Sequence, residues 1–600
     1  MAGAPGSDIR KVTAMDDRIV QSRQSYLVDK GGQAVTNQPV SANAQSSSQI
    51  SFQFQVPSEQ VFVSRGVNFT STYTLTFNCT PPAAVGALIV PGRDFALAPF
   101  PLHQAVQTAN PVINSTSVTV NTNDVKDFLL RMTDYKGVRL QRTCPTKLSS
   151  YVSYNDEANS LQNTLAGYEN MSDRFETPNG AYPITFCDPN SGAALAGNGS
   201  YTFGGVTVDY LAGIPQISVG ANPHPVCVSF TSTEKLLASP FVFNDEHQWD
   251  TGLFGIQNIT LTLNLQAPSR CLRFSSSSGR VCTAPTFTTA AGNGGVNGSR
   301  LDFEVISPSL EIPLPPKSVI PVYQYPSFIQ TYSETLAPGA ARLALPSQTI
   351  NLNRIPDYLV IGVRPQTYLP TEADWFFRIT GIRINFDNVA GLLSTQSAAQ
   401  LYQASVHNGL EMSYPEWSGQ ATQVTGGAAS TVATTGSLLV LRPGIDFALQ
   451  TGLAPGVAGN FTIRFEVDIV NQSANTYNSG NPFRMVLITP ESGYFESVRG
   501  SSRILTGLLT PQDVLSSEAG DVITRMESRR MVGAAVMGGG VLDKLSSAFS
   551  TAKSLYDRAK PVISAVKEVA KAIPHEKSRA VGDVLGKMGF GAGRLNERLM

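Results

Sequence analysis

Five segments of the chain alternate strictly between apolar and polar residues, and this pattern limits the fold more than any other feature. The segments cover residues 50–56, 73–77, 259–265, 382–386 and 461–469. Successive side chains of a β-strand point to opposite faces, so each segment would place its apolar residues on one face. The pattern predicts half-buried sheets.

The composition fits a protein made of many short strands. The chain has 600 residues, of which 51 are glycine, 38 are proline and only 15% are charged. Glycine and proline supply the turns that such strands need. A chain of this length exceeds what one hydrophobic core normally serves, so we expect at least two domains.

A proline-rich stretch at residues 308–326 divides the chain. It carries six prolines, which remove ladder donors and fix φ, so we interpret it as a stiff connector and not as a central strand. The predicted organisation is an N-terminal arm over 1–48, a β-rich domain over 49–307 and a second β-rich domain over 327–520. Each domain is large enough for an eight-stranded sandwich with long loops. One helix is predicted over 392–403, with Leu393, Ala398, Leu401 and Tyr402 on one face.

Residues 91–97 (PGRDFAL) and 443–449 (PGIDFAL) are nearly identical. The first lies early in its domain and the second late, which disfavours tandem duplication. We interpret both as the same turn chemistry, a Pro-Gly turn that leads into an apolar strand.

The charge balance argues against a dedicated nucleic-acid binder, because binding to phosphates needs an excess of Lys and Arg. The net charge is −1, although residues 541–600 carry eleven Lys and Arg against six Asp and Glu. No signal-peptide core and no membrane-length apolar run is present, and Ala2 stands where myristoylation would need glycine. We therefore expect assembly inside a host cell.

The six cysteines are widely spaced and form no CxxC pair. They are Cys79, Cys144, Cys187, Cys227, Cys271 and Cys282. A zinc site or a dense disulfide framework is disfavoured, and buried free thiols are expected.

No enzyme signature stands out, so no catalytic residue, metal ligand or cofactor is predicted. His247 with Asp245, Glu246 and Asp250 is the best cluster of polar groups, but without a second histidine it is typical of an inter-strand loop. Paired carboxylates of a glycosidase leave no signature. One alternative is thus a β-sandwich carbohydrate-binding protein or glycosidase.

The tail differs in character from the rest. Over 541–600 it is predicted to be a basic amphipathic helical segment, which could contact a membrane, another helix or a genome. Its apolar face is formed by Leu542, Leu545, Phe549, Ala552, Tyr556 and Ala559. The residues before it, 521–540, are predicted to be a flexible Gly/Ala linker, and the small, uncharged stretch at 531–541 is open to proteolysis.

Several short stretches, in this order, resemble the major capsid proteins of virophages and Polinton-like viruses of the adenovirus-like lineage. They are KGGQAVT at 30–36, PGRD at 91–94, PF at 240–241 with NDE at 244–246 and GIQN at 255–258, IPLPP at 312–316, TLAP at 335–338 and IPDYL at 355–359. Each is weak alone; their ordered succession over roughly residues 25–500 carries the resemblance.

The resemblance implies an all-β fold of two tandem jelly-roll barrels, a double jelly roll, with the arm and helical tail appended. It implies a major capsid protein of a double-stranded DNA virus, whose homotrimers form pseudo-hexagonal capsomers that tile an icosahedral shell of the virion. Implied partners are neighbouring capsomers, penton and minor capsid proteins and a maturation protease. Another alternative is a single-jelly-roll penton or minor capsid protein, which the second β-rich domain disfavours.

The linker also resembles the cleavage sites of adenovirus-type maturation proteases, in which Gly-Gly follows a large apolar residue. Met537, Gly539, Gly540 and Val541 form the main candidate, with cleavage after Gly540. A weaker candidate comprises Met531, Gly533, Ala534 and Ala535.

Overall fold

The computed structural model describes most of the chain up to residue 522. The described residues are 10–12, 34–58, 60–80, 87–91, 94–132, 152, 184–217, 223–241, 252–275, 281–289, 293–307, 317–425, 428–472, 482–498, 500–506, 509–516 and 519–522. The tail face and both cleavage candidates lie outside them, as do Cys144 and the loop around His247.

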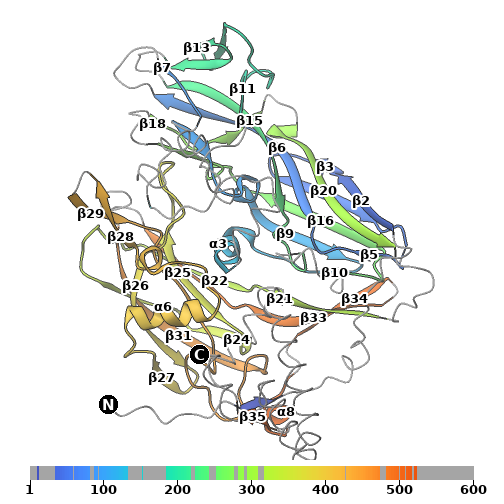
Figure 1. The fold of residues 1–600 in the computed structure, drawn as a ribbon, viewed down its shortest axis with the longest axis vertical. Coiled ribbons are helices and arrows are strands. Elements are labelled where there is room, and N and C mark those ends of the chain that lie inside the picture. The colour runs from blue at the N-terminus through green and yellow to red at the C-terminus, as the bar shows by residue number, and fades with distance from the viewer. Residues whose placement is uncertain are drawn as a thin grey trace, which may run out of the picture. The chain divides into compact units, whose positions relative to one another are not determined.

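Two facing sheets form the first jelly roll (Figure 1). The five-stranded sheet has the order β10 (Thr116–Ser117), β9 (Val106–Ile113), β16 (Asn258–Leu265), β4 (Gln49–Gln55) and β3 (Ala44–Gln45). The eight-stranded sheet has the order β11 (Thr185–Cys187), β15 (His224–Lys235), β6 (Asn68–Thr80), β20 (Val296–Ser307) and β2 (Ala34–Ser41), with β18 (Val281–Cys282) and β19 (Thr286–Phe287) paired to β6 and β5 (Phe62–Val63) paired to β20. Phe54 of β4 stacks on Phe303 of β20 at 4.5 Å between ring centroids, so the two sheets share one core.

Smaller strands extend this barrel. They are β12 (Gly199–Phe203), β13 (Val206–Leu211), β14 (Ile214–Ile217) and β7 (Ala87–Leu88) in one sheet, and β17 (Leu272–Phe274) with β8 (Phe95–Leu97) in another.

The second jelly roll is also built from two sheets. One sheet has the order β22 (Ser327–Tyr332), β32 (Phe483–Ile488), β25 (Leu359–Pro365) and β30 (Leu438–Leu441). The other contains β23 (Leu343–Pro346), β31 (Ala458–Val470), β26 (Arg378–Phe386) and β27 (Val389–Leu392), with β24 (Ile350–Arg354) paired to β31. A hairpin of β28 (Gln420–Thr425) and β29 (Ala428–Ala433) projects from it (Figure 1).

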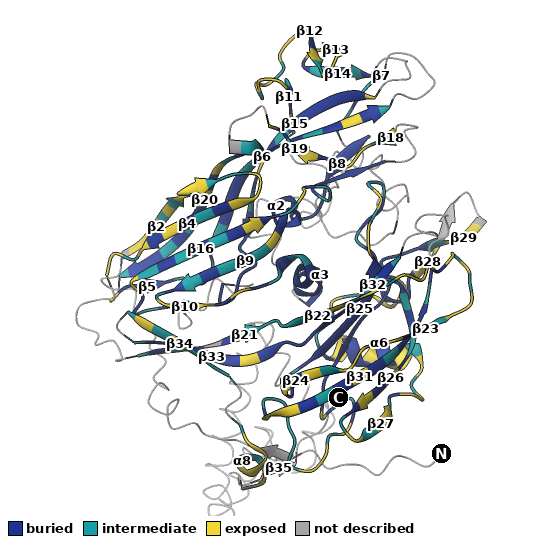
Figure 2. Ribbon diagram, turned by 180° about the vertical axis from the view of Figure 1, so that it is seen from behind, coloured by how far each residue is buried: buried dark blue, intermediate teal, exposed yellow. Residues whose placement is uncertain are grey.

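All five alternating segments of the sequence lie in strands, and their alternation of burial is largely as predicted, although some polar residues are buried as well, such as Thr74 within β6. In β4 the apolar residues Ile50, Phe52 and Phe54 are buried, whereas the polar residues between them are partly or fully exposed. The same alternation of buried and exposed residues follows β16, β26 and β31 (Figure 2). The all-β fold of two jelly rolls is confirmed.

The described helices are short. They are α2 (Pro101–Gln104), α3 (Thr122–Met132), α6 (Ala398–His407), α7 (Tyr414–Trp417) and α8 (Pro511–Ser516), with a 3-10 turn η3 at Asn293–Gly295. The predicted helix over 392–403 begins later, at α6, because Ser397 and Gln400 form a capping box there. Leu393 precedes this helix, while Leu401 lies on its buried face. None of the described helices has the length and apolar character needed to cross a bilayer.

Parts of the predicted arm, connector and linker form strands. In the arm, β2 pairs along its whole length with β20, and β1 (Arg10–Val12) pairs with β35 (Ala519–Val522). In the connector, β21 (Ser318–Gln324) forms a three-stranded sheet with β33 (Glu491–Val498) and β34 (Ser501–Thr506). Because β21 is an edge strand, its Pro321 is tolerated. The structure thus places residues 318–324 in a sheet and not in a plain connector.

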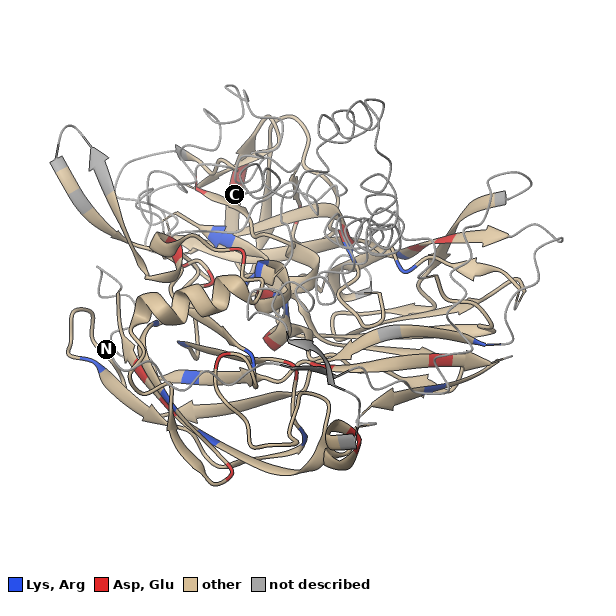
Figure 3. Cartoon of the chain, turned by 60° about the horizontal axis from the view of Figure 1, so that its bottom comes forward, with Lys and Arg blue, Asp and Glu red and all other residues tan. Residues whose placement is uncertain are grey.

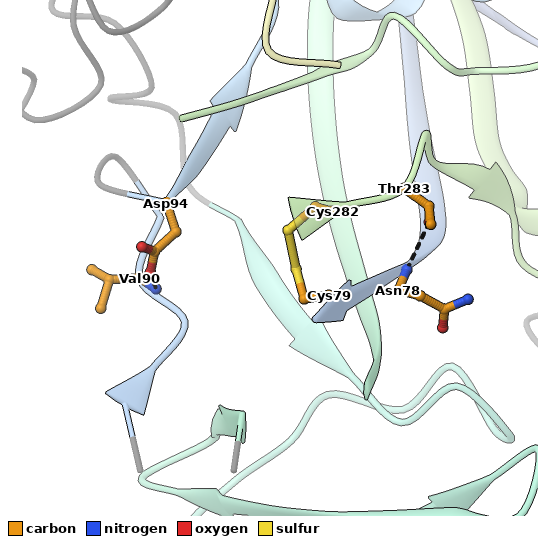
Figure 4. Close-up of a disulfide and its surroundings, with 6 residues drawn as sticks. All are labelled: Asn78, Cys79, Val90, Asp94, Cys282 and Thr283. Atoms are coloured by element: carbon orange, nitrogen blue, oxygen red, sulfur yellow. Dashed lines mark hydrogen bonds between the residues drawn. A yellow bond between two sulfur atoms is a disulfide. The ribbon is translucent and has the colours of Figure 1, made fainter. Parts of the chain in front are cut away.

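The expectation of free thiols is wrong for one pair. Cys79 and Cys282 form a disulfide across a sequence separation of 203 residues (Figure 4). Strand β18 pairs with the end of β6 and sets the two cysteines opposite each other, with Thr283 Oγ1 accepting a hydrogen bond from Asn78 N at 3.0 Å. Cys187, Cys227 and Cys271 are free and buried as expected.

The repeated PGxDFAL turn has the same geometry in both barrels. Asp94 Oδ2 accepts a hydrogen bond from Val90 N at 2.7 Å (Figure 4), and Asp446 Oδ2 accepts one from Arg442 N at 2.8 Å. The two copies also share an isolated bridge, between Pro91 and Phe95 in the first and between Pro443 and Phe447 in the second, so the shared turn is confirmed. The apolar strand that was expected to follow is present only after the first copy, as β8, and the expectation is wrong for the second.

Candidate functional site at the junction of the two barrels

Helix α3 connects the two barrels. It follows strands β9 and β10 in the chain, and Figures 1 and 2 show it between the five-stranded sheet and strands β22 and β25. Its apolar residues Val125, Phe128, Leu129 and Met132 are buried in the hydrophobic cluster of the second barrel. Phe128 also meets Tyr325 edge-on, with ring centroids 6.4 Å apart. A segment of the first half of the sequence thus completes the core of the second half.

The polar face of α3 makes buried ion pairs with the second barrel. Arg364 of β25 donates to Asp124 Oδ1 at 2.7 Å and to Asp127 Oδ2 at 3.1 Å. Arg484 of β32 lies 3.3 Å from the same Asp124 oxygen. Burial alone would lower the pKa of Arg364, but the neighbouring Tyr368, Asp127 and Asp124 reverse this effect and raise it. Arg364 therefore stays charged inside the junction.

Arg270 and Asp374 form a second ion pair across the junction. Arg270, which precedes β17, donates through Nη2 to Asp374 Oδ1 at 2.9 Å and to the Glu372 carbonyl at 2.8 Å. Its guanidinium also stacks over the Tyr368 ring, 4.8 Å from the centroid. Burial opposes ionisation of Asp374, yet Arg270, Lys126 and Arg131 outweigh it and lower its pKa to about 2.

The second half of the chain in turn completes the first barrel. Ile320 and Val322 of β21 and Phe495 of β33 belong to the hydrophobic core of the first barrel. Ser497 Oγ donates to the Gly255 carbonyl at 2.9 Å, and Ser502 Oγ donates to the Ile113 carbonyl at 2.6 Å. Each half of the chain thus contributes residues to the core of the other half's barrel. The junction is therefore an interlock and not a simple contact between two domains that are each complete alone.

One histidine–carboxylate pair lies inside the first barrel. His103 Nδ1 is 2.6 Å from Glu234 Oε2, and both side chains are at most 1% exposed. Glu234 also accepts hydrogen bonds from the backbone of α2, and His103 Nε2 accepts one from Leu237 N at 3.1 Å. Because each of these polar atoms already serves to hold α2, the pair is structural.

Outside the junction, the described charged side chains form few clusters. Lys, Arg, Asp and Glu are sparse along the strands (Figure 3), and the described residues contain no group of three or more metal-ligating side chains. Sequence reasoning missed the charged junction, since its partners come from helix α3 and from strands some 240 residues away. The DVKDFLL run of α3, with two acidic residues on one side and apolar residues on the other, is the available signal.

A chain of two jelly rolls in tandem, joined through such an interlock, has the architecture of the double jelly-roll capsid proteins. The family model described as the Sputnik virophage major capsid protein first domain matches residues 7–306, and that of the major capsid protein V20 C-terminal domain matches residues 325–493. The first match covers half of the chain, and the chain belongs to the virophage major capsid protein family.

Individual relatives agree with this assignment. The putative capsid protein V20 of Sputnik virophage is 24% identical over 598 residues, which cover 95% of this chain and 92% of that protein. The cryo-EM structure of the Sputnik virophage contains a chain with a TM-score of 0.68 and 21% identity, covering 87% of this chain and 98% of that one. The mavirus major capsid protein has a TM-score of 0.59 and 15% identity, covering 87% and 100%.

The chain is therefore a structural component of a virion shell that is assembled from copies of itself. The alternative of a single-jelly-roll penton or minor capsid protein is wrong, because two barrels are present. The family match identifies the chain as a capsid protein, in place of the alternative of a β-sandwich carbohydrate-binding protein or glycosidase.

Proposed function

We propose that three copies of the chain form a pseudo-hexagonal capsomer and that these capsomers tile an icosahedral shell. The buried contacts of Arg364 with Asp124 and Asp127 support this proposal. They make the two barrels of one chain a single building unit, so three chains would present six barrels around one axis. The protein acts as a structural element with no external substrate.

Light scattering of the purified full-length chain tests the proposal. A native mass three times that of one chain is the expected result. A stable monomer or a pentamer would overturn the trimeric capsomer.

Contacts between copies should be extensive and weakly charged. Obligate interfaces are more apolar than ordinary surfaces and bury thousands of Å² in total, on the order of 2,000–5,000 Å². A chain with only 15% charged residues suits this requirement. Raising the salt concentration should therefore leave the trimer intact, because apolar contacts are not screened by ions.

We further infer that a viral maturation protease removes the tail after Gly540, with the site around Ala534 and Ala535 as the weaker candidate. The support is the sequence: a small, uncharged stretch at residues 531–541 precedes a basic amphipathic segment. Once released, this segment would contact genome or membrane, while the shell would contact penton and minor capsid proteins. Mass spectrometry of mature particles should find chains that end at Gly540; intact tails in every subunit would exclude cleavage.

A further inference from the structure

Lys126 is buried in α3 in an unusual environment. The residue is only 4% exposed. Among the residues that the structure describes, its amine makes no ion pair, and its hydrogen bond goes to the side-chain oxygen Oε1 of Gln104, in α2. A buried ammonium without a bonded counter-ion is costly, so this position favours the uncharged amine.

Gln104 is held between Lys126 and a carboxylate from the second barrel. It is 3% exposed, and its Nε2 donates to Asp374 Oδ2 at 3.2 Å and to the Pro99 carbonyl at 3.3 Å. Asp374 is in turn fixed by Arg270 through its other oxygen, Oδ1. The carboxamide therefore has an amine at its oxygen and a proton acceptor at its nitrogen, and both Gln104 and Lys126 are buried.

The electrostatic surroundings keep Lys126 reactive. Burial, the largest effect, lowers the pKa of the amine, and Arg364 and Arg270 add to this, against the opposite effect of Asp127 and Asp374. A lowered pKa increases the fraction of the neutral amine, and this form is the nucleophile, whereas an ammonium is not.

We propose that Lys126 and Gln104 form an intramolecular isopeptide bond, with Asp374 as the proton carrier. The Lys126 Nζ lone pair attacks Cδ of Gln104, and a bond between Nζ and Cδ forms. The bond between Cδ and Nε2 breaks, and ammonia leaves. Asp374 takes a proton from Nζ and gives it to Nε2, which it already contacts, and ends as a carboxylate. No oxidant, reductant or external reagent takes part.

Formation of the amide removes the free-energy cost of burying a charged amine at this site. An amide carries no charge, so the reaction replaces a buried titratable amine by a neutral group. The new bond would tie α2, whose Leu102 lies in the core of the first barrel, covalently to α3, whose apolar residues lie in the core of the second. Ammonia leaves irreversibly, so the barrel junction would be fixed once the chain has folded.

Intact-mass spectrometry of the reduced, full-length chain is the first test. The reaction removes ammonia, so the mass should fall by about 17 Da below that of the sequence. The full sequence mass would overturn the proposal directly.

Trypsin digestion of the denatured chain locates the bond. Residues 94–126 contain no Lys or Arg before Lys126, so an unmodified chain gives the peptide 94–126. The cross-linked chain should resist cleavage after Lys126 and give a peptide 94–131, lighter by about 17 Da. Loss of ammonia from an asparagine in the same peptide would leave cleavage after Lys126 intact and would overturn the proposal. Cleavage after Lys235, which is also buried in the folded chain, controls for complete digestion.

Two variants test the proposed roles of Lys126 and Asp374 separately. Lys126→Arg keeps a positive side chain but no amine nucleophile, and it should show the full mass and normal cleavage at the substituted position. Asp374→Asn should react more slowly after refolding, by tenfold or more. An unchanged rate in Asp374→Asn would exclude Asp374 as the proton carrier, and a mass loss that persists in Lys126→Arg would exclude Lys126 as the nucleophile.

Discussion

Arg364 Nη2 lies 2.7 Å from Asp124 Oδ1, although the two residues are 240 positions apart in the chain. This contact joins the central part of the second barrel to a helix supplied by the first half of the sequence. Both side chains are at most 5% exposed, so the pair is shielded from solvent and salt.

Replacing Arg364 by methionine should destabilise the chain strongly. It would leave Asp124 with Arg484 as its remaining cationic partner and would remove the ion pair of Asp127, in a buried site. Breaking a buried pair from one side costs about 3–5 kcal/mol. The free energy of unfolding, from urea titration, measures the loss.

Arg383→Met is the matched control for that variant. Arg383 pairs with Glu466 at 3.1 Å, but the two side chains are 49% and 36% exposed. An exposed pair contributes at most about 1 kcal/mol. Equal effects of the two substitutions would show that the junction is not shielded as described.

Phe128→Ala tests whether α3 belongs to the core of the second barrel. Phe128 is 2% exposed within that core, so truncation should leave a cavity and cost about 3–5 kcal/mol. Leu515→Ala is the control, because Leu515 is 58% exposed in α8, and it should change stability by less than about 0.5 kcal/mol. A small effect of Phe128→Ala, read from the same urea titration, would contradict the docking of α3.

Reduction of the Cys79–Cys282 disulfide should lower the stability of the first barrel. The bond closes a sequence separation of 203 residues, and loss of such a cross-link typically costs about 2–5 kcal/mol. Thermal unfolding with and without dithiothreitol measures the change. Alkylation of the denatured, unreduced chain should label Cys187, Cys227 and Cys271 and spare the bonded pair; labelling of Cys79 would contradict the bond.

Asp374 should make the stability of the junction sensitive to acid. Because its pKa in the folded chain is lowered to about 2, below the unfolded value of about 3.9, the unfolded state binds the proton more readily. The stability that Asp374 contributes is thus present above about pH 4 and is lost as the pH falls toward 2. The difference in melting temperature between wild type and Asp374→Asn should shrink over this interval. A constant difference would contradict the assignment.

Local periodicity predicted β4, β6, β16, β26 and β31, but not strands that are buried on both faces, such as β25 and β30. In Phe461, Ile463 and Phe465 the alternation directly encodes which face of β31 is buried. The edges were less predictable, because β2 and β21 have exposed or proline-containing sequences and are ordered by their pairing to β20 and β33.

The junction could not be predicted, because each of its contacts links distant residues. Nothing near Asp124 indicates Arg364, and nothing near Cys79 indicates Cys282. Helix α3 was missed for a related reason: three charged residues and an asparagine within its first two turns hide its apolar face, which becomes evident only against the second barrel.

The place of Phe495 has a consequence for how the chain is made. This residue completes the core of the barrel that begins at β2, so a ribosome must synthesise almost five hundred residues before that barrel can close. Until then its apolar faces stay open, and pairing over such distances is slow and prone to aggregation. The nascent first barrel should therefore depend on chaperones for most of translation, and a chain that stops after the first family domain should not yield a soluble half-capsomer.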